Sequence, residues 1–447
     1  MTRIKTQSTK TGILVLMIAA MAASGCSILR KSAPKTPVLG HRVAVLMTEN
    51  DAAVDPATAA LPMVLPAPVA NADWAQSGGN ASKSMGQLEL GTNLAQTFSV
   101  SIGYGSTLGA RLAAAPVVGG GRVYTIDINS TVRAFDAQTG AKIWESQFGL
   151  EKGNSSSLFG GGVAYDNGRI YATNGLGFAV ALDNRNGGVL WQVRPGGPLR
   201  GAPTVAGDTL YVMSQDNQIY SLKTADGTTN WSNAASLEIA GVFGAGSPAF
   251  AQGTVVAGFS SGELNAYRYE NGRLVWQDAL ARTSIRTSVS SLSDIDANAV
   301  IDNGQVFAIG QGGRMVALEL ISGQRQWELN IAGIASPWVA GDWIFVCTDD
   351  SRLIAIARNT GKVRWINQLP QFEHQKSKHG QITYRGPVLA GGRLILVGSN
   401  GTLINFDPVT GNFQSQTSVG APITQAPVVA NSTLYVLDDR GQLHAFR

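Results

Sequence analysis

The stretch that decides the fold is Ala134-Phe135-Asp136-Ala137-Gln138-Thr139-Gly140-Ala141-Lys142-Ile143-Trp144, in which a tryptophan follows a turn glycine by four positions. The same spacing recurs in five later copies: Gly187/Trp191, Gly227/Trp231, Gly272/Trp276, Gly323/Trp327 and Gly361/Trp365. A seventh copy keeps the turn at Gly411 but has Ser415 in the tryptophan position. Units that repeat every roughly 40 to 50 residues indicate one supersecondary module that is stacked or arranged in a ring.

Each unit is predicted to form four short strands. In the most regular copy these strands cover 115–118, 122–126, 132–136 and 143–144, with small polar turns between them. Asp136 can bind the backbone of its own turn, and Gly140 can adopt a positive φ without a steric penalty. The pattern therefore predicts an all-β fold, an eight-bladed β-propeller of four-stranded antiparallel blades.

The ring is expected to close through an N-terminal strand. The inner strands of the eight blades should begin near Pro116, Val163, Pro203, Pro248, Val300, Pro337, Pro387 and Pro427. The eighth copy reaches Arg447 without a fourth strand, whereas Phe98–Gly103 matches Trp144–Gly149 with Phe98 in the tryptophan position. This strand should complete the last blade and remove the exposed sheet edges.

The N-terminus has the features of a leader. Three basic residues precede the apolar run 13–21, and small residues then lead to Cys26, which predicts a signal peptide over 1–25. Ala23-Ser24-Gly25-Cys26 resembles a bacterial lipobox, with Ala23 where a leucine is usual. This resemblance implies cleavage before Cys26 and its lipidation, and Ser27 in place of an aspartate implies the outer membrane. The alternative is an ordinary secretory signal with a chance cysteine.

The remaining chain is predicted to divide at about Trp74. Residues 26–73 contain the lipidated cysteine and a Pro/Ala-rich tether, and residues 74–447 form the propeller. One strand is expected at 42–47, packed on the propeller or added to a partner's sheet. The leader holds three of the 34 basic residues and none of the 30 acidic ones, so the mature chain is nearly neutral and nucleic acid is not an expected partner.

The sequence contains little that indicates catalysis. His374 and His379 share one loop but lack a third metal ligand at suitable spacing. The glycine triplets at 119–121 and 160–162 are explained by turns and strand starts, and no phosphate loop ending in Gly-Lys-Ser/Thr is present. Cys347 should be a buried small hydrophobe in the strand 343–347. We therefore expect no catalytic, cofactor or metal site.

Two related families share the repeat. Residues 134–144 resemble the tryptophan-docking motif of pyrroloquinoline-quinone (PQQ) dehydrogenases, and Trp74–Asn80 resembles the lead-in to that eight-bladed fold. Those enzymes typically carry adjacent cysteines and a calcium site, whereas the two cysteines of this chain are far apart. The chain more closely resembles the non-catalytic BamB family of outer-membrane assembly lipoproteins, which has the same order of signal peptide, lipobox and propeller.

The BamB resemblance implies particular contact residues. Leu292-Ser293-Asp294-Ile295-Asp296 is similar to the family segment whose paired aspartates contact the insertase BamA, which implies partner binding by Asp294 and Asp296. The second family segment, Leu-x-Leu-Arg-Gly, is partly kept in Leu237-Glu238-Ile239-Ala240-Gly241, which implies contacts through Leu237 and Ile239. Ala240 replaces the arginine of that segment. The alternative for Asp294 and Asp296 is a structural role as capping carboxylates of an inter-blade turn.

Together these features imply a scaffold of the β-barrel assembly machinery. The protein would be anchored by lipid to the outer membrane, face the periplasm, dock on a BamA-like insertase and assist insertion of outer-membrane proteins. Unfolded outer-membrane proteins are a further candidate partner. Two alternatives remain open: a PQQ-dependent oxidoreductase, and a propeller that binds cell wall or polysaccharide.

Overall fold

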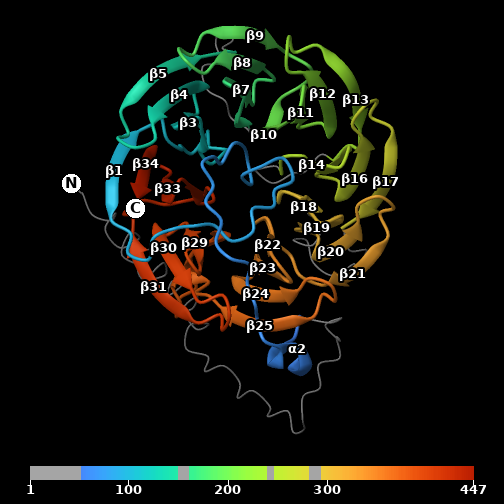
Figure 1. The fold of residues 1–447 in the computed structure, drawn as a ribbon, viewed down its shortest axis with the longest axis vertical. Helices are drawn as coiled ribbons and strands as arrows, with labels where there is room; N and C mark the ends of the chain where they lie inside the picture. The colour runs from blue at the N-terminus through green and yellow to red at the C-terminus, as the bar shows by residue number, and fades with distance from the viewer. Residues whose placement is uncertain (1–51, 150–160, 239–245, 281–292) are drawn as a thin grey trace, which may run out of the picture. The chain divides into compact units, whose positions relative to one another are not determined.

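The computed structural model describes residues 52–149, 161–238, 246–280 and 293–447. They form eight four-stranded antiparallel sheets arranged around a central axis, which confirms the predicted propeller (Figure 1). One short helix, α2 (Pro56–Ala60), lies beside the outer strand of blade six. The described part of the chain contains no helix that is long and apolar enough to span a membrane.

The strands of each blade follow one another from the axis outward. Blade one contains β2 (Val117–Gly119), β3 (Arg122–Ile126), β4 (Thr131–Asp136) and β5 (Lys142–Gln147). Blade two contains β6 (Gly161–Asp166), β7 (Arg169–Asn174), β8 (Ala179–Asp183) and β9 (Val189–Val193). Blade three contains β10 (Leu199–Ala206), β11 (Thr209–Ser214), β12 (Gln218–Lys223) and β13 (Thr229–Ala234). Blades four to six contain β14 (Ala249–Ala251), β15 (Thr254–Gly258), β16 (Glu263–Arg268), β17 (Leu274–Ala279); β18 (Val300–Asp302), β19 (Gln305–Gly310), β20 (Arg314–Glu319), β21 (Arg325–Leu329); and β22 (Trp338–Ala340), β23 (Trp343–Cys347), β24 (Arg352–Ala357), β25 (Val363–Gln368). Blades seven and eight contain β28 (Tyr384–Ala390), β29 (Arg393–Gly398), β30 (Thr402–Phe406), β31 (Phe413–Ser418); and β32 (Val428–Ala430), β33 (Thr433–Leu437), β34 (Gln442–Phe446), β1 (Gln96–Ser101). A separate hairpin, β26 (Phe372–His374) and β27 (His379–Gln381), lies in the connection between blades six and seven.

The repeated tryptophans join each blade to the next. Trp276 of blade four donates its indole N–H to the Leu320 carbonyl of blade five at 2.8 Å. Gly323 of the same turn has φ +70°, and a methyl group on it would lie 2.5 Å from the Trp276 ring. The equivalent indole donations run from Trp144 to Asn184, Trp191 to Thr224, Trp231 to Tyr269, Trp327 to Arg358 and Trp365 to Pro408. The glycine and the tryptophan of the repeat therefore form the interface between neighbouring blades.

The predicted closure of the ring is confirmed. β1 pairs antiparallel with β34, with Val100 opposite Leu443. Phe98 occupies the tryptophan position of blade eight and covers Gly140 of blade one, where an added methyl group would meet its ring at 2.6 Å. The last and first blades are thus joined by the same packing of an aromatic ring on a turn glycine, without the indole hydrogen bond.

The missing tryptophan at Ser415 has a structural explanation. An indole in blade seven would dock on the turn between the third and fourth strands of blade eight. Those strands are β34 and β1, which are distant in sequence, and Ala95 and Arg447 exchange two backbone hydrogen bonds there in place of a glycine turn. Ser415 instead accepts a hydrogen bond from Asn405 of its own blade at 2.9 Å.

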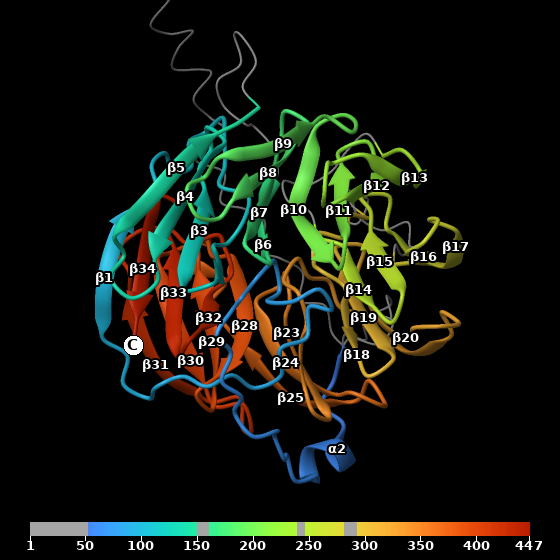
Figure 2. The same cartoon turned by 45° about the horizontal axis from the view of Figure 1, so that its top comes forward.

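An N-terminal segment, which we call the axial plug (residues 71–88), crosses the centre of the ring (Figures 1 and 2). It hydrogen-bonds to all eight blades, in the following pairs from blade one to blade eight: Trp74 with Val118, Ala75 with Tyr165, Gln76 with Val205, Ala81 with Phe250, Ser82 with Ile301, Gly86 with Trp338, Leu88 with Leu389, and Asn71 with Asn431. The plug thus satisfies backbone groups of the innermost strands that would otherwise face the axis.

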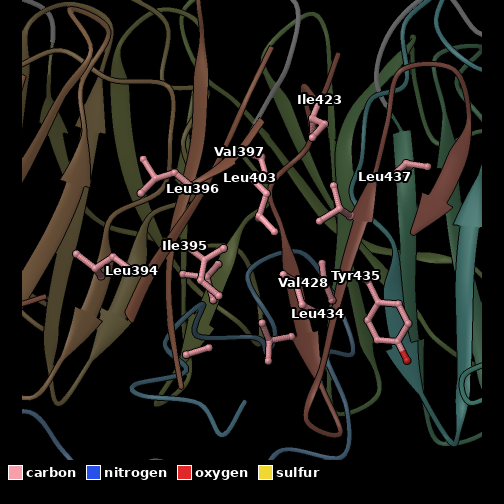
Figure 3. Close-up of a cluster of buried hydrophobic side chains, with 14 of the residues drawn as sticks. Leu394, Ile395, Leu396, Val397, Leu403, Ile423, Val428, Leu434, Tyr435 and Leu437 are labelled. Atoms are coloured by element: carbon pink, nitrogen blue, oxygen red, sulfur yellow. The ribbon is translucent and has the colours of Figure 1, made fainter. Parts of the chain in front are cut away.

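The hydrophobic core lies between the sheets. Figure 3 shows one part of it, where Ile395 and Val397 of β29 and Leu434 of β33 lie between blades seven and eight. Tyr435 of β33 points the other way and donates its hydroxyl to the Ala137 carbonyl of blade one at 3.0 Å. Cys347 is buried in β23, as expected, and burial raises the pKa of its thiol to about 12.

Candidate functional site

The two ends of the ring carry different kinds of connection. Within a blade the strands alternate in direction, so the connections between blades all emerge at the end where the inner strands begin. The glycine turns and the bonds of the axial plug lie at the opposite end. We call the first end the docking face; it carries the long connections after β13, β17 and β25. Loops held on a rigid scaffold are common sites of recognition.

Asp294 and Asp296 precede blade five on the docking face, but their carboxylates point inward. The side chain of Asp294 is 1% exposed and that of Asp296 is 6% exposed. Both accept hydrogen bonds from one guanidinium nitrogen of Arg200, at 3.1 Å from Asp294 and 3.3 Å from Asp296. Arg200 lies at the start of blade three, so this cluster spans blade four.

This burial bears on how Asp294 and Asp296 could take part in partner binding. Residues two apart in an extended segment do point the same way, but the cation that Asp294 and Asp296 face belongs to the same chain. They are therefore not a pair that faces a partner's cationic patch directly. Their participation in docking stays a prediction, and the arrangement favours an indirect part in it, through the position of their loop.

The electrostatics of the cluster make Asp296 unusual. Burial raises the pKa of Asp296 to about 7, and the nearby Asp294 carboxylate acts in the same direction against Arg200 and Arg385. The Oδ2 atom of Asp296 is buried and has no hydrogen-bond partner among the described residues. Burial also raises the pKa of Asp349, which lies close to Arg385. The site thus combines incompletely neutralised carboxylates with two arginines.

Leu237, unlike Asp294 and Asp296, is exposed as a residue that contacts a partner should be. It follows β13 on the docking face, and 72% of it is exposed. The base of its loop is held by Ser236, whose backbone N–H and hydroxyl both donate to the Glu263 carboxylate at 2.8 Å. Ile239 and Ala240 lie outside the described residues, as do Cys26 and the strand expected at 42–47.

An axial cavity of about 460 Å³ lies inside the ring. Its wall includes the starts of inner strands and the inter-blade segments before them, among them Pro116, Val163, Ala202, Ser247, Asn298, Pro337, Pro387 and Pro427. The axial plug contributes Trp74, Ser77, Gly78 and Lys83. Asp296, Arg111 and Arg385 also line the cavity, so it combines apolar walls with charged groups.

Lys83 is the most unexpected of these groups. It is 4% exposed, and its ammonium donates to the Thr204 hydroxyl at 2.9 Å. Burial lowers the pKa of Lys83 to about 7. Sequence reasoning missed it because Gly78-Gly79-Asn80-Ala81-Ser82-Lys83 reads as a polar turn, which gives no indication that it enters the centre of a ring.

Sequence reasoning also missed Arg200. The resemblance placed an arginine at the position of Ala240, in the connection between blades three and four. The arginine that binds Asp294 and Asp296 is instead Arg200, at the start of blade three. The pattern in the sequence that could have identified Arg200 is Leu199-Arg200-Gly201.

The hairpin between blades six and seven offers two nitrogen ligands. His374 and His379 are opposite each other across β26 and β27, with ring centroids 6.2 Å apart. Among the described residues there is no cluster of three or more groups that could hold a metal ion.

Comparisons with known proteins agree on one family. Residues 97–157 and 128–367 match the sequence profile described as outer membrane protein assembly factor BamB. The outer membrane protein assembly factor BamB of Yersinia pestis is 27% identical over 336 residues, which span 74% of this chain and 83% of that protein. The protein of the same name from Escherichia coli (strain K12) is 27% identical over 334 residues, with the same coverage.

Solved structures support the fold. The crystal structure of BamB from Moraxella catarrhalis superimposes with a TM-score of 0.63 at 18% identity, covering 80% of this chain and 98% of that one. A europium-containing methanol dehydrogenase superimposes with a TM-score of 0.64 at 15% identity, covering 82% and 89%. At these identities the likeness concerns the fold alone, so the dehydrogenase says nothing about the chemistry of this chain.

Proposed function

Because the chain belongs to the family of the outer membrane protein assembly factor BamB, we propose that it is a non-catalytic scaffold of a β-barrel assembly complex. The names of its relatives imply association with the outer membrane. In our proposal the protein is anchored there by lipid on Cys26, faces the periplasm, docks on a BamA-like insertase and assists the insertion of outer-membrane proteins.

The observation that carries the docking proposal is the exposed side chain of Leu237 on the docking face. The loop base is held by two hydrogen bonds to Glu263, so the leucine is presented by a fixed support. An exposed apolar side chain next to a fixed loop base can serve as an anchor, because little conformational entropy of that base is lost on binding.

The aspartates contribute as positioning residues. Asp294 and Asp296 hold the segment before blade five against Arg200. We propose that this cluster sets the position of the loop beside Leu237 rather than supplying charge to the partner. Replacing Asp294 and Asp296 with arginine would place three cations together in a buried space, so it tests the fold more than the interface.

The docking proposal is tested with Leu237→Arg. A charged side chain in the centre of an apolar contact should weaken binding to the purified insertase by roughly thirtyfold, about 2 kcal/mol. The matched control is Ile321→Arg, because Ile321 is 67% exposed but lies in a glycine turn at the opposite end of the ring. Binding is measured by surface plasmon resonance on proteins whose melting curves coincide. Equal affinity of both variants and the wild type would reject the docking face.

The anchor is tested separately with Cys26→Ser. This substitution should abolish acyl labelling and move the protein out of the outer-membrane fraction, since serine has no thiol to accept the lipid. If the unaltered protein carries no acyl label and still sediments with the outer membrane, the lipid anchor is wrong.

A further inference from the structure

We propose that the axial cavity is a binding site for a small acidic sugar, a polyhydroxylated ring that carries one carboxylate. The carboxylate would face Lys83 on the axial plug, and hydroxyl groups would face Asp296 and Ser247 toward the docking face. The inference does not depend on the docking proposal, because Leu237 is not among the residues that line the cavity.

The size of the cavity suits such a ligand. Its volume of about 460 Å³ is within the range of roughly 300 to 1,000 Å³ that is usual for small-molecule sites. The wall is largely apolar, with alanines at 113–115 and two stacked indoles, Trp74 and Trp338, whose ring centroids are 6.1 Å apart. Flat apolar side chains can pack against the C–H face of a sugar ring.

Lys83 supplies the reason for a negative charge. Its ammonium is buried, and the hydrogen-bond partner that the structure shows is the neutral hydroxyl of Thr204. A buried cation is costly unless an anion accompanies it. The backbone of Lys83 is also in the left-handed region, with φ +67°, which is unfavourable for a side chain of this type. Strained conformations that place a charged group in a cavity are typical of ligand sites.

Two unsatisfied oxygens supply the reason for hydroxyl groups. Ser247 and Asp296 line the same cavity, and the Oγ atom of Ser247 and the Oδ2 atom of Asp296 are buried without a hydrogen-bond partner among the described residues. A buried polar atom without a partner costs about 1–3 kcal/mol. A carboxylate oxygen accepts hydrogen bonds and a carboxyl O–H donates one, so a sugar hydroxyl, which can do both, suits either form of Asp296.

The arrangement argues against simpler ligands. An apolar molecule would leave both oxygens and Lys83 unsatisfied. A fully deprotonated inorganic anion such as sulfate could pair with Lys83 but would offer no donor to Asp296. The other charged groups of the wall are Arg111 and Arg385, and Arg385 already donates to the backbone carbonyls of Thr424 and Ile334 at 3.0 and 3.3 Å.

Three ring-shaped probes separate these contributions. D-glucuronate carries a carboxylate and hydroxyls, D-glucose carries hydroxyls without the carboxylate, and cyclohexanecarboxylate carries the carboxylate without hydroxyls. In isothermal titration calorimetry at pH 6.5, D-glucuronate should bind, and each of the other two should bind about tenfold more weakly or worse. The proposal is overturned if D-glucuronate gives no saturable heat up to about 10 mM, or if D-glucose binds equally well.

Two substitutions locate the site. Lys83→Met keeps most of the length of the side chain and removes its charge, so D-glucuronate should bind about tenfold more weakly while D-glucose is unaffected. Lys142→Met is the matched control, because Lys142 is exposed on β5. Ser247→Ala should also weaken D-glucuronate binding and provides the test if Lys83→Met fails to fold. Unchanged affinity in the folded variants would overturn the assignment.

A proton count gives an independent readout. The pKa of Lys83 is lowered to about 7 by burial, so the amine is largely neutral at pH 8. A bound carboxylate would raise this pKa, and binding at pH 8 should therefore take up a proton. Calorimetry in buffers with different ionisation enthalpies measures this uptake. Binding without proton uptake in the wild type would contradict the contact with Lys83.

Discussion

At the residue scale, the glycine and the tryptophan of the repeat serve one interface together. Gly323 must have a positive φ to form its turn, and its lack of a side chain lets the Trp276 ring lie against the backbone. The Trp276 indole then donates to the carbonyl of Leu320 in the same turn. The four-residue spacing recurs because blades one to six each supply an indole to the glycine turn of the next blade.

Gly323→Ala should destabilise the protein by about 2–4 kcal/mol, since the methyl group meets Trp276 and the positive φ becomes unfavourable. Urea denaturation followed by tryptophan fluorescence measures the effect. Gly304→Ala is the matched control, because Gly304 has φ +76° and open space around it. It should cost about 1–2 kcal/mol, from the backbone alone. Equal losses in the two variants would show that the indole contact contributes nothing.

At the element scale, two N-terminal segments complete the ring. β1 supplies the fourth strand of blade eight, and the axial plug bonds to the inner strands of all eight blades. The plug joins residues from 44 positions apart (Trp74 and Val118) to 360 positions apart (Asn71 and Asn431), and β1 pairs with the last strand of the chain, so the ring is held together by long-range pairing.

Phe98→Ala should lower the free energy of unfolding by about 2–3 kcal/mol, because it removes the ring that joins blade eight to blade one. Phe413→Ala is the matched control: Phe413 also lies on an outer strand, but it is 56% exposed and joins no blades. It should cost less than about 1 kcal/mol. Thermal melting of both variants decides whether closure depends on this side chain, and a larger loss at Phe413 would refute it.

Gln76→Ala tests the axial plug. The Gln76 amide donates to the Val205 carbonyl at 3.2 Å and accepts from the Val205 N–H at 2.9 Å, and it is buried. Its removal leaves two buried backbone groups without partners, which should cost about 2–4 kcal/mol. Gln416→Ala on the exposed outer strand of blade seven should be nearly neutral in the same chemical denaturation. If both are neutral, the plug does not stabilise the ring.

At the scale of the whole molecule, the docking face is held by charges that cross between blades. Arg200 of blade three reaches Asp294 and Asp296, which precede blade five, and thereby fixes the connection beside blade four. Such a buried cluster is a weak source of net stability, but breaking it by removing one member is strongly destabilising. The cluster is therefore a candidate for setting the relative position of loops on the docking face.

Arg200→Met should lower the free energy of unfolding by roughly 3–5 kcal/mol near neutral pH, because two buried carboxylates lose their cation. The deficit should shrink at pH 5. Burial already raises the pKa of Asp296, and without Arg200 this pKa rises further above its unfolded value, so the folded form holds more protons in acid and loses stability as pH rises. Arg185→Met, which breaks an exposed pair with Asp183, should have little effect. A deficit that does not depend on pH would mean that packing, not charge, explains it.

The sequence by itself determined the architecture of the ring. The turn glycine, the tryptophan four residues later and the alternating strands are local patterns, so they predicted eight blades, the position of each inner strand within four residues, and the closure through Phe98. Even the exception at Ser415 was visible, although its reason was not. Local patterns are readable because each strand and turn depends mainly on residues within one unit.

Only the tertiary structure decided what faces the axis and the docking face. Arg200, Asp294 and Lys83 come from segments with unremarkable local sequence, and their burial results from the ring bringing distant segments together. Asp294 and Asp296 both reach Arg200, and no local pattern states whether the cation that meets such a pair belongs to a partner or to the chain itself. Which charged groups meet in such a site, and how deeply they are buried, depends on packing between distant segments. No single repeat unit contains the residues that decide this packing.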